Sequence, residues 1–222
     1  MAINKKQFSF LRQSGVTLVE LVVVIAIFAL VSSVLLFNYS NFSTNVSIRN
    51  LSQDLALTIR KAQTYATSVQ GISTLGGGPQ SYPAYGISFS LDANGGQYEP
   101  NKKKFILFVD AIDPNTGSPN KQYDAGATCG TPSAGDECLE SYSIGSADSI
   151  VSLCSDATGC VSTGSFDVSF HRPSPDAIIC YKTDFSARCS STTISYLDVV
   201  LESAQGTRRT VSVWNTGQIS VK

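Results

Sequence analysis

The sequence Ser14-Gly15-Val16-Thr17-Leu18-Val19-Glu20, followed directly by an apolar run that ends at Phe37, decides the fold of this chain. The residues from Val16 to Phe37 contain a single charged residue, Glu20. As a helix they would extend roughly 33 Å, enough to cross a hydrocarbon core about 30 Å thick. The run therefore predicts a membrane-spanning and assembly helix over residues 16–37.

Glu20 is an unusual residue for an apolar membrane helix. A carboxylate inside a membrane costs about 2.5–3.5 kcal/mol on insertion scales, so such a residue marks a functional site with a partner. The leader before the helix, residues 1–15, carries Lys5, Lys6 and Arg12 and no acidic residue. An ordinary secretory signal is cleaved after its apolar region. Here the plausible cleavage site precedes that region, so the helix would stay in the mature protein.

At these residues the chain resembles the type IV pilin-like family, which contains type IV pilins and the pseudopilins of type II secretion. The family pattern is a basic leader ending in Gly, then a hydrophobic residue, Thr, Leu, an apolar residue, Glu and a long apolar helix. The matching positions are Gly15, Val16, Thr17, Leu18, Val19, Glu20 and Leu21, with Val16 where Phe or Met is commoner. The resemblance implies that a prepilin peptidase cleaves between Gly15 and Val16 and N-methylates Val16. The alternative is an uncleaved signal anchor that contains a glutamate by chance.

Cleavage at Gly15 would give Glu20 a partner. The new α-amino group of one subunit and the carboxylate of a neighbour can neutralise each other, which removes the cost of a lone buried charge. We therefore expect Glu20 to act in assembly with other pilin or pseudopilin subunits. The basic leader favours a cytoplasmic N-terminus. We expect a single-pass protein of the cytoplasmic (inner) membrane with its head outside the cytoplasm, which an inner-membrane platform then assembles into an extracytoplasmic filament.

Helix-forming sequence continues beyond the apolar run. No Gly or Pro occurs between Val16 and Gln70, so the strongest helix breakers are absent. After a polar patch, apolar residues recur at spacings of three and four: Ile48, Leu51, Leu55, Ile59, Ala62, Ala66 and Val69. This stripe predicts an amphipathic continuation of the helix over residues 38–70, packed on a globular domain and ending near Gly71. Lys61 lies off the stripe and is expected to be solvated.

Residues 71–222 have the composition of a β-rich globular head. The sequence Gly76-Gly77-Gly78-Pro79 predicts a flexible or turn-rich connector. Short runs rich in Val, Ile, Phe and Tyr follow and predict antiparallel strands over residues 85–90, 104–110, 150–153, 166–171, 177–181, 194–201, 210–214 and 218–221. Asn215-Thr216-Gly217 predicts a hairpin turn between the last two. The expected fold is α+β, with the long N-terminal helix packed on a C-terminal antiparallel β-sheet head.

A second, weaker resemblance concerns the subgroup. Residues 51–68, 166–177 and 211–222 are similar to GspH/FimT-type minor pilins and pseudopilins, in which a helix of this kind leads into a two-sheet head. Several of these relatives carry Gly followed by Arg-rich residues at the C-terminus. This chain has Gly217-Gln218-Ile219-Ser220-Val221-Lys222 there. A nucleic-acid role tied to those arginines is therefore not expected.

All six cysteines lie in the head, at Cys129, Cys138, Cys154, Cys160, Cys180 and Cys189. An even number in an exported domain favours disulfides, although sequence alone does not fix the connectivity. Neighbouring cysteines are separated by 9, 6 and 9 residues within successive pairs, so we predict that these neighbours pair with each other. The alternative is a zinc site, but the chain has no Cys-x-x-Cys pair and one His. No metal site is expected.

Charge argues against nucleic acid as a partner. The formal net charge is −1, and removal of the three leader cations gives −1 − 3 = −4 before the new amine is counted. A mildly acidic head does not favour phosphate backbones or anionic lipids. The basic clusters Lys102-Lys103-Lys104 and Arg208-Arg209 are expected to be solvated edges or turns. Asp110, Asp113 and Asn115 lack the spacing of a calcium loop and are expected to be polar loop residues.

No catalytic constellation is apparent. His171 stands alone, and the chain has no Gly-x-Ser-x-Gly elbow, no phosphate loop and no His-Glu-x-x-His helix. We expect neither enzyme activity nor a cofactor. The sequence predicts a structural subunit, a minor pilin or pseudopilin of a type IV pilus or type II secretion filament. The alternative from another functional class is a pilus-borne binding module, either an adhesin or a DNA-capture subunit.

Overall fold

The computed structural model describes residues 15–68, 83–92, 97–110, 119–124, 128–130, 136–183, 189 and 193–222, with the backbone alone in residues 36–41. The chain divides into two units, Met1–Phe42 and Ser43–Lys222. The leader before Gly15, the predicted helix stop at Gly71 and the predicted connector at residues 76–79 lie outside the described residues.

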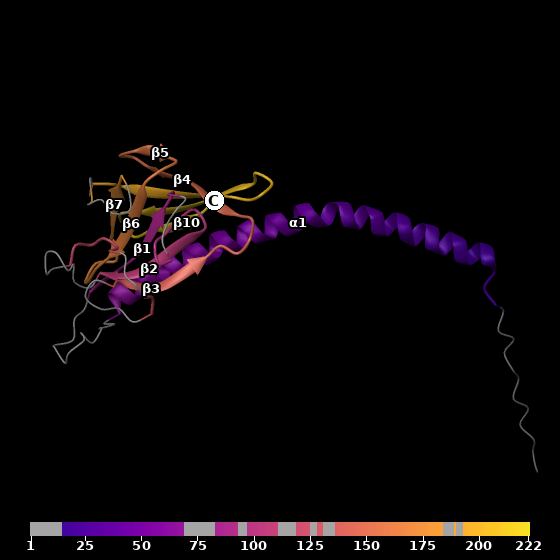
Figure 1. Cartoon of the computed structure of the whole chain (residues 1–222), viewed down its shortest axis with the longest axis horizontal. Helices are drawn as coiled ribbons and strands as arrows, with labels where there is room; N and C mark the ends of the chain where they lie inside the picture. The colour runs from indigo at the N-terminus through magenta and orange to yellow at the C-terminus, as the bar shows by residue number, and fades with distance from the viewer. Residues whose placement is uncertain are drawn as a thin grey trace, which may run out of the picture. The chain divides into compact units, whose positions relative to one another are not determined.

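The helix α1 (Leu18–Thr67) is continuous over 50 residues, as the absence of Gly and Pro predicted (Figure 1). In the second unit, the predicted stripe faces the protein interior. Ile48, Leu55 and Ile59 are fully buried, and the smaller Ala62 and Ala66 are at most 1% exposed. Val69 lies outside the described residues. The stripe therefore fixes which face of the helix packs on the head.

Within the described residues, ten strands form two antiparallel five-stranded sheets. The first sheet has the order β3 (Cys138–Ser143), β2 (Lys104–Asp110), β1 (Ala84–Ser90), β6 (Ser165–Phe170) and β7 (Ala177–Lys182). The second has the order β10 (Ile219–Val221), β9 (Arg208–Trp214), β8 (Tyr196–Glu202), β4 (Ser149–Ser155) and β5 (Gly159–Val161). The α+β class and the antiparallel head predicted from sequence are confirmed.

Eight of these strands lie where the sequence predicted them, and the other two were not predicted. The missed strands, β3 and β5, are edge strands of their sheets. β3 contains Glu140 and two serines, and β5 has only three residues. Neither presents an apolar run of the kind on which the predictions depended.

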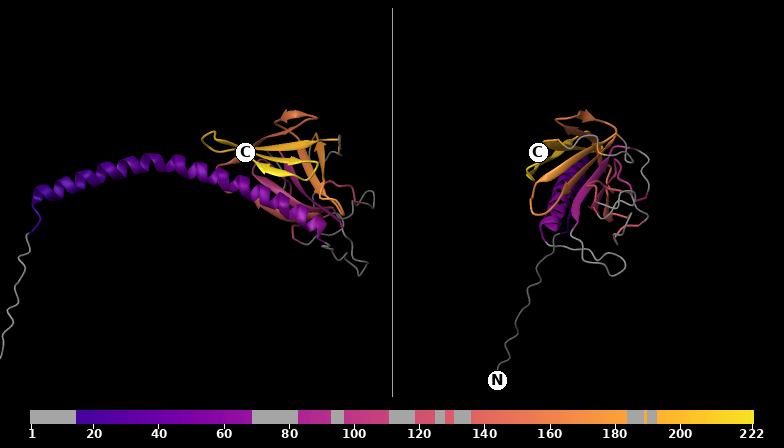
Figure 2. Two further views of the ribbon diagram at one scale, coloured as in Figure 1. Left: turned by 180° about the vertical axis from the view of Figure 1, so that it is seen from behind. Right: turned by 90° about the vertical axis from the view of Figure 1, so that its left-hand side faces the viewer.

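One hydrophobic core joins α1 to both sheets. Alternate residues of the central strands enter it, such as Ile87 in β1, Val168 in β6 and Val199 in β8, all fully buried. Figure 2 shows the last part of α1 beside the strands in both views. The predicted turn at Asn215-Thr216-Gly217 connects β9 to β10, where Trp214 N donates to Gln218 O at 2.9 Å. Gly217 has φ +79°, a left-handed conformation that suits glycine.

The first sheet is covered on its other face as well. Ile106 and Phe108 of β2 pack there with Tyr123 and Cys138. Gly86 of β1 lets the Phe108 ring approach the sheet closely, since a Cβ on Gly86 would lie 2.6 Å from that ring. The central strand β1 is consequently buried along its whole length. This second layer carries most of the buried polar groups described below.

Candidate functional site

The peptide bond between Gly15 and Val16 lies just before the helix. Both residues are exposed, and 71% of Val16 is accessible. The helix begins two residues later, at Leu18. Thr17 caps it, because Thr17 Oγ1 accepts a hydrogen bond from Glu20 N at 3.3 Å and Thr17 O accepts one from Leu21 N. The peptide bond between Gly15 and Val16 is therefore exposed and lies outside the helix.

Thr17 and Glu20 form the sequence pattern of a capping box, Thr-x-x-Glu. Glu20 thus lies in the first turn of α1, where a carboxylate interacts favourably with the positive end of the helix dipole. Glu20 was expected to act in assembly, and this local role was not predicted. The Thr-x-x-Glu spacing before an apolar run is the signal that would have revealed it.

The surface of α1 between Glu20 and Leu35 is apolar and uncovered. Residues Leu18–Leu35 have a mean hydropathy of 2.8, and none of them is buried inside the protein. By length and composition this part of the helix can cross a membrane. An exposed apolar surface of this size requires a lipid or protein environment.

The motif is matched by a known family. Residues 11–36 match the family described as the prokaryotic N-terminal methylation motif. This motif, the apolar helix that overlaps it and the antiparallel sheets that follow in the sequence fit the type IV pilin-like family. The match begins within the leader and ends inside α1. No significant match was found among curated proteins or among solved structures.

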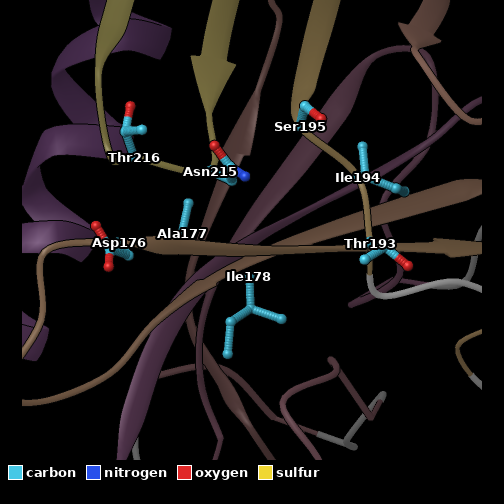
Figure 3. A pocket seen from close by; sticks show the side chains of 8 residues that line it. All are labelled: Asp176, Ala177, Ile178, Thr193, Ile194, Ser195, Asn215 and Thr216. Atoms are coloured by element: carbon cyan, nitrogen blue, oxygen red, sulfur yellow. The ribbon is translucent and has the colours of Figure 1, made fainter.

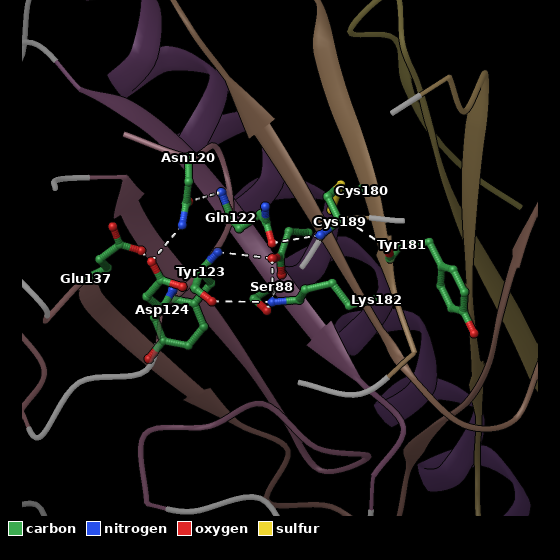
Figure 4. A network of polar contacts seen from close by, with 11 residues as sticks. Ser88, Asn120, Gln122, Tyr123, Asp124, Glu137, Cys180, Tyr181, Lys182 and Cys189 are labelled. Carbon is green, nitrogen blue, oxygen red and sulfur yellow. Dashed lines mark hydrogen bonds and ion pairs between the residues drawn. A yellow bond between two sulfur atoms is a disulfide. The ribbon is translucent and has the colours of Figure 1, made fainter. Parts of the chain in front are cut away.

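In the head, the most buried charges form a polar network on the outer face of the first sheet (Figure 4). Lys182 Nζ lies 2.8 Å from Asp167 Oδ2, and their side chains are 1% and 0% exposed. Ser88 Oγ donates to Asp167 Oδ1 at 2.5 Å, and Tyr123 N donates to Asp167 Oδ2 at 3.0 Å. Lys182 Nζ also donates to Tyr123 O at 3.3 Å. Each charge of the pair therefore has further hydrogen-bond partners, which a buried ion pair needs.

Two more carboxylates attach the segment 119–124 to the sheet. Asp110 accepts hydrogen bonds from the backbone N–H groups of Asn120 and Lys121, both at 3.0 Å. Lys121 has φ +62°, and successive N–H groups in such a turn form a concave anion site. Glu137 Oε2 accepts from Asp124 N at 2.9 Å. The acidic side chains thus hold a chain segment in place.

This arrangement corrects the prediction for Asp110. It is the last residue of β2 and 1% exposed, whereas a polar loop residue was predicted. Asp113 and Asn115 lie outside the described residues. Burial raises the pKa of Asp110 from 3.8 to about 6, although the N–H groups of Asn120 and Lys121 oppose the shift. The local sequence could not show this, because the donors come from a segment ten residues later.

The structure places the cysteines in three bonded pairs, Cys129–Cys138, Cys154–Cys160 and Cys180–Cys189. Their Cα–Cα distances are 4.7, 3.9 and 5.5 Å. Cys154 and Cys160 are directly opposite each other on β4 and β5. These are the neighbour pairs predicted from sequence, and their oxidation in the exported protein remains a prediction.

Three cations of the basic clusters, Lys103, Lys104 and Arg208, make local contacts. Lys103 Nζ donates to Asp148 O at 2.5 Å, and Lys104 Nζ donates to Gln97 O at 2.8 Å. Arg208 pairs with Glu202 at 2.5 Å. Lys61, expected to be solvated, is half-buried and pairs with Glu140 of β3 at 2.5 Å. That prediction was wrong because the edge strand β3, which supplies the partner, was not recognised.

His171 follows β6 directly and is half-buried. Its Nδ1 atom is buried without a hydrogen-bond partner among the described residues. No nucleophile or carboxylate is shown in contact with this ring within the described residues. His171 is therefore partly covered at the end of β6, and nothing in its described surroundings assigns it a chemical role.

Proposed function

We propose that this chain is a structural subunit, a minor pilin or pseudopilin of GspH/FimT-like type, of a type IV pilus or type II secretion filament. The observation that carries the proposal is the methylation motif placed directly before a helix with an uncovered apolar surface. The two-sheet head supports the subgroup, since the sequence resemblance implied that architecture. The role is mechanical, and no enzymatic activity is proposed.

Processing would precede assembly. A prepilin peptidase would cleave between Gly15 and Val16 and methylate the new α-amino group. The exposed position of Val16 and the helix start at Leu18 support this, because a peptidase needs an extended, accessible segment. The mature protein would remain in the cytoplasmic membrane by residues 16–37, with its head outside the cytoplasm, until an inner-membrane platform transfers it to the filament.

Glu20 would direct the packing of one subunit on the next. Among the described residues, Glu20 is exposed and has no side-chain partner of its own. In a membrane or a filament core an unpaired carboxylate is costly. The methylated amino group at Val16 of an adjacent subunit would supply the missing positive charge. Assembly would therefore favour the register in which these two groups meet.

Mass spectrometry of the assembled protein tests the proposal. We expect an N-terminal peptide that begins at Val16 and carries one methyl group on its α-amine. A Gly15→Leu variant should retain the whole leader and stay out of filaments, whereas Gly145→Leu, on an exposed residue of the head, serves as the control. An intact leader on assembled wild-type protein would contradict the proposal.

The alternative, a pilus-borne binding module, is favoured by one feature of the head, the pocket described in the next subsection. DNA capture has less support. Lys103, Lys104 and Arg208 are engaged locally, which reduces the positive charge available to release counterions from a duplex. Tight duplex binding at about 150 mM salt that is lost on mutating Arg208 and Arg209 would favour DNA capture instead.

A further inference from the structure

A pocket of about 380 Å³ opens where the start of β7 meets residues 193–195 and the β9–β10 turn (Figure 3). Asp176 and Thr193 lie on opposite sides of it, with Ala177 and Ile178 between them. Its size falls within the range of about 300–1,000 Å³ that is typical of small-molecule sites.

Hydrogen bonds hold the three segments around the pocket in fixed positions. Ala177 N donates to Asn215 O at 2.8 Å, and Asn215 N donates to Ser195 O at 2.9 Å. Ser195 N donates to both oxygens of Asp156, at 3.0 and 3.1 Å. The pocket is therefore formed before any ligand arrives, which reduces the entropy cost of binding.

A side chain of α1 also holds the segments around this pocket together. Gln63 Nε2 donates to Pro175 O at 2.9 Å and to Gly217 O at 3.1 Å. Gly217 is in close contact with this support, since a Cβ there would lie 2.2 Å from Pro175 O. The turn that carries Asn215 and Thr216 is consequently packed against the segment that carries Asp176.

The lining combines an apolar floor with polar groups at the rim. Ala177 and Ile194 are 5% and 2% exposed and form the floor with the half-buried Ile178. The exposed rim residues are Asp176, Thr193, Asn215 and Thr216. Within the described part of the chain, their side chains make no hydrogen bond to the protein. Their donors and acceptors are thus available to a ligand.

The chemistry of these groups selects a ligand class. The lining contains one carboxylate, one amide and hydroxyl groups, and it contains neither a cationic nor an aromatic side chain. A site without a cation does not favour phosphate or other anions. Asp176 can accept two hydroxyl protons, Asn215 can both donate and accept, and the apolar floor can contact C–H groups. A neutral ring with several hydroxyl groups and one apolar face satisfies all of these groups at once.

We propose that this pocket binds a neutral saccharide, entering as one pyranose residue of a glycan. This binding site goes beyond the assembly role proposed above and does not depend on it. The open rim would allow the remainder of a glycan to leave the pocket towards solvent. Asp176 and Asn215 would orient the hydroxyl groups, while Ala177 and Ile178 would contact the ring.

Saturation-transfer NMR on the full chain in a detergent without a sugar headgroup tests the proposal. The probes are the methyl pyranosides of glucose, galactose and mannose and of N-acetylglucosamine, with methylammonium and inorganic phosphate as charged comparisons. We expect at least one pyranoside to bind saturably in the millimolar range. Asp176→Asn and Asn215→Ala should each weaken it about tenfold, because each removes a hydrogen bond to the ligand.

Asp54→Asn on α1 is the matched control, since it removes an exposed carboxylate outside the pocket, and it should leave binding unchanged. Equal thermal unfolding midpoints for wild type and Asp176→Asn will show that the fold is kept. Absence of pyranoside binding to the wild type would overturn the proposal, as would binding of methylammonium or phosphate alone. Pyranoside binding that persists at wild-type strength in both pocket variants would overturn it as well.

Discussion

Lys182 and Asp167 form an ion pair between β7 and β6 that is almost completely sealed from water, with Nζ and Oδ2 2.8 Å apart. The free energy of the pair depends on both partners being present. Removal of either one leaves a charge in the interior without its counterion, which costs about 3–5 kcal/mol. The segment 119–124 depends on the same pair, because Asp167 also accepts from Tyr123 N.

The first prediction follows from this burial. Lys182→Met should lower the free energy of unfolding of the full chain by about 3–5 kcal/mol, and Asp167→Asn in the same background should restore part of the loss. Arg208→Met is the matched control, because Arg208 is 68% exposed in its pair with Glu202 and should cost less than about 1 kcal/mol. Denaturant unfolding followed by the fluorescence of Trp214, the chain's one tryptophan, measures both. Equal losses for the two variants would contradict this account.

The second prediction concerns Asp110 and pH. Its pKa is raised from 3.8 to about 6 by burial, so between these values the folded protein binds more protons than the unfolded chain. Below pH 3.8, Asp110 makes its full contribution to the stability of the folded protein. This contribution is lost as the pH rises through about 6. The loss is at most about 3 kcal/mol.

Asp110→Asn removes this titration, so the variant should gain stability relative to wild type as pH rises from about 4 to about 7. Unfolding free energies of the two proteins, measured at matched pH values, give the difference directly, because the other titrating groups cancel. A constant difference between wild type and Asp110→Asn across this range would rule out the effect.

The fold was largely predictable from sequence, whereas the polar layer of the head was not. The unbroken helix and the apolar strands depend on local composition and periodicity, and both are confirmed in α1 and in strands such as β2. The partners of Asp167 come from Ser88 and Tyr123, 79 and 44 residues away. A single clue was present locally: Asp167, between Phe166 and Val168, is the one charged residue of β6. Its partners depend on strand order, which the sequence pattern does not specify.

The third prediction concerns the disulfides. Peptide mapping of the exported protein without reduction should recover Cys129 with Cys138, Cys154 with Cys160, and Cys180 with Cys189. Each closes a short loop and should stabilise the head by about 2–3 kcal/mol. A reduced and alkylated sample provides the control, in which these linked peptides should disappear. Recovery of free thiols at all six positions would contradict both the pairing and the exported location of the head.

The last prediction separates two roles of the helix start. Glu20→Ala removes the carboxylate that would pair with the amino group of a neighbouring subunit, yet it makes the helix more apolar and easier to insert. We expect normal amounts in the membrane and at least about a tenfold loss from filaments, since the amino group of a neighbour would be left unpaired.

Thr17→Val is the matched control, because it removes the cap that Thr17 Oγ1 provides at a cost of about 1 kcal/mol and keeps the carboxylate. Quantitative immunoblots of membrane and filament fractions measure both variants. If Thr17→Val disrupts filaments as strongly as Glu20→Ala, or if Glu20→Ala is lost from the membrane, Glu20 serves the formation of the helix and not subunit pairing.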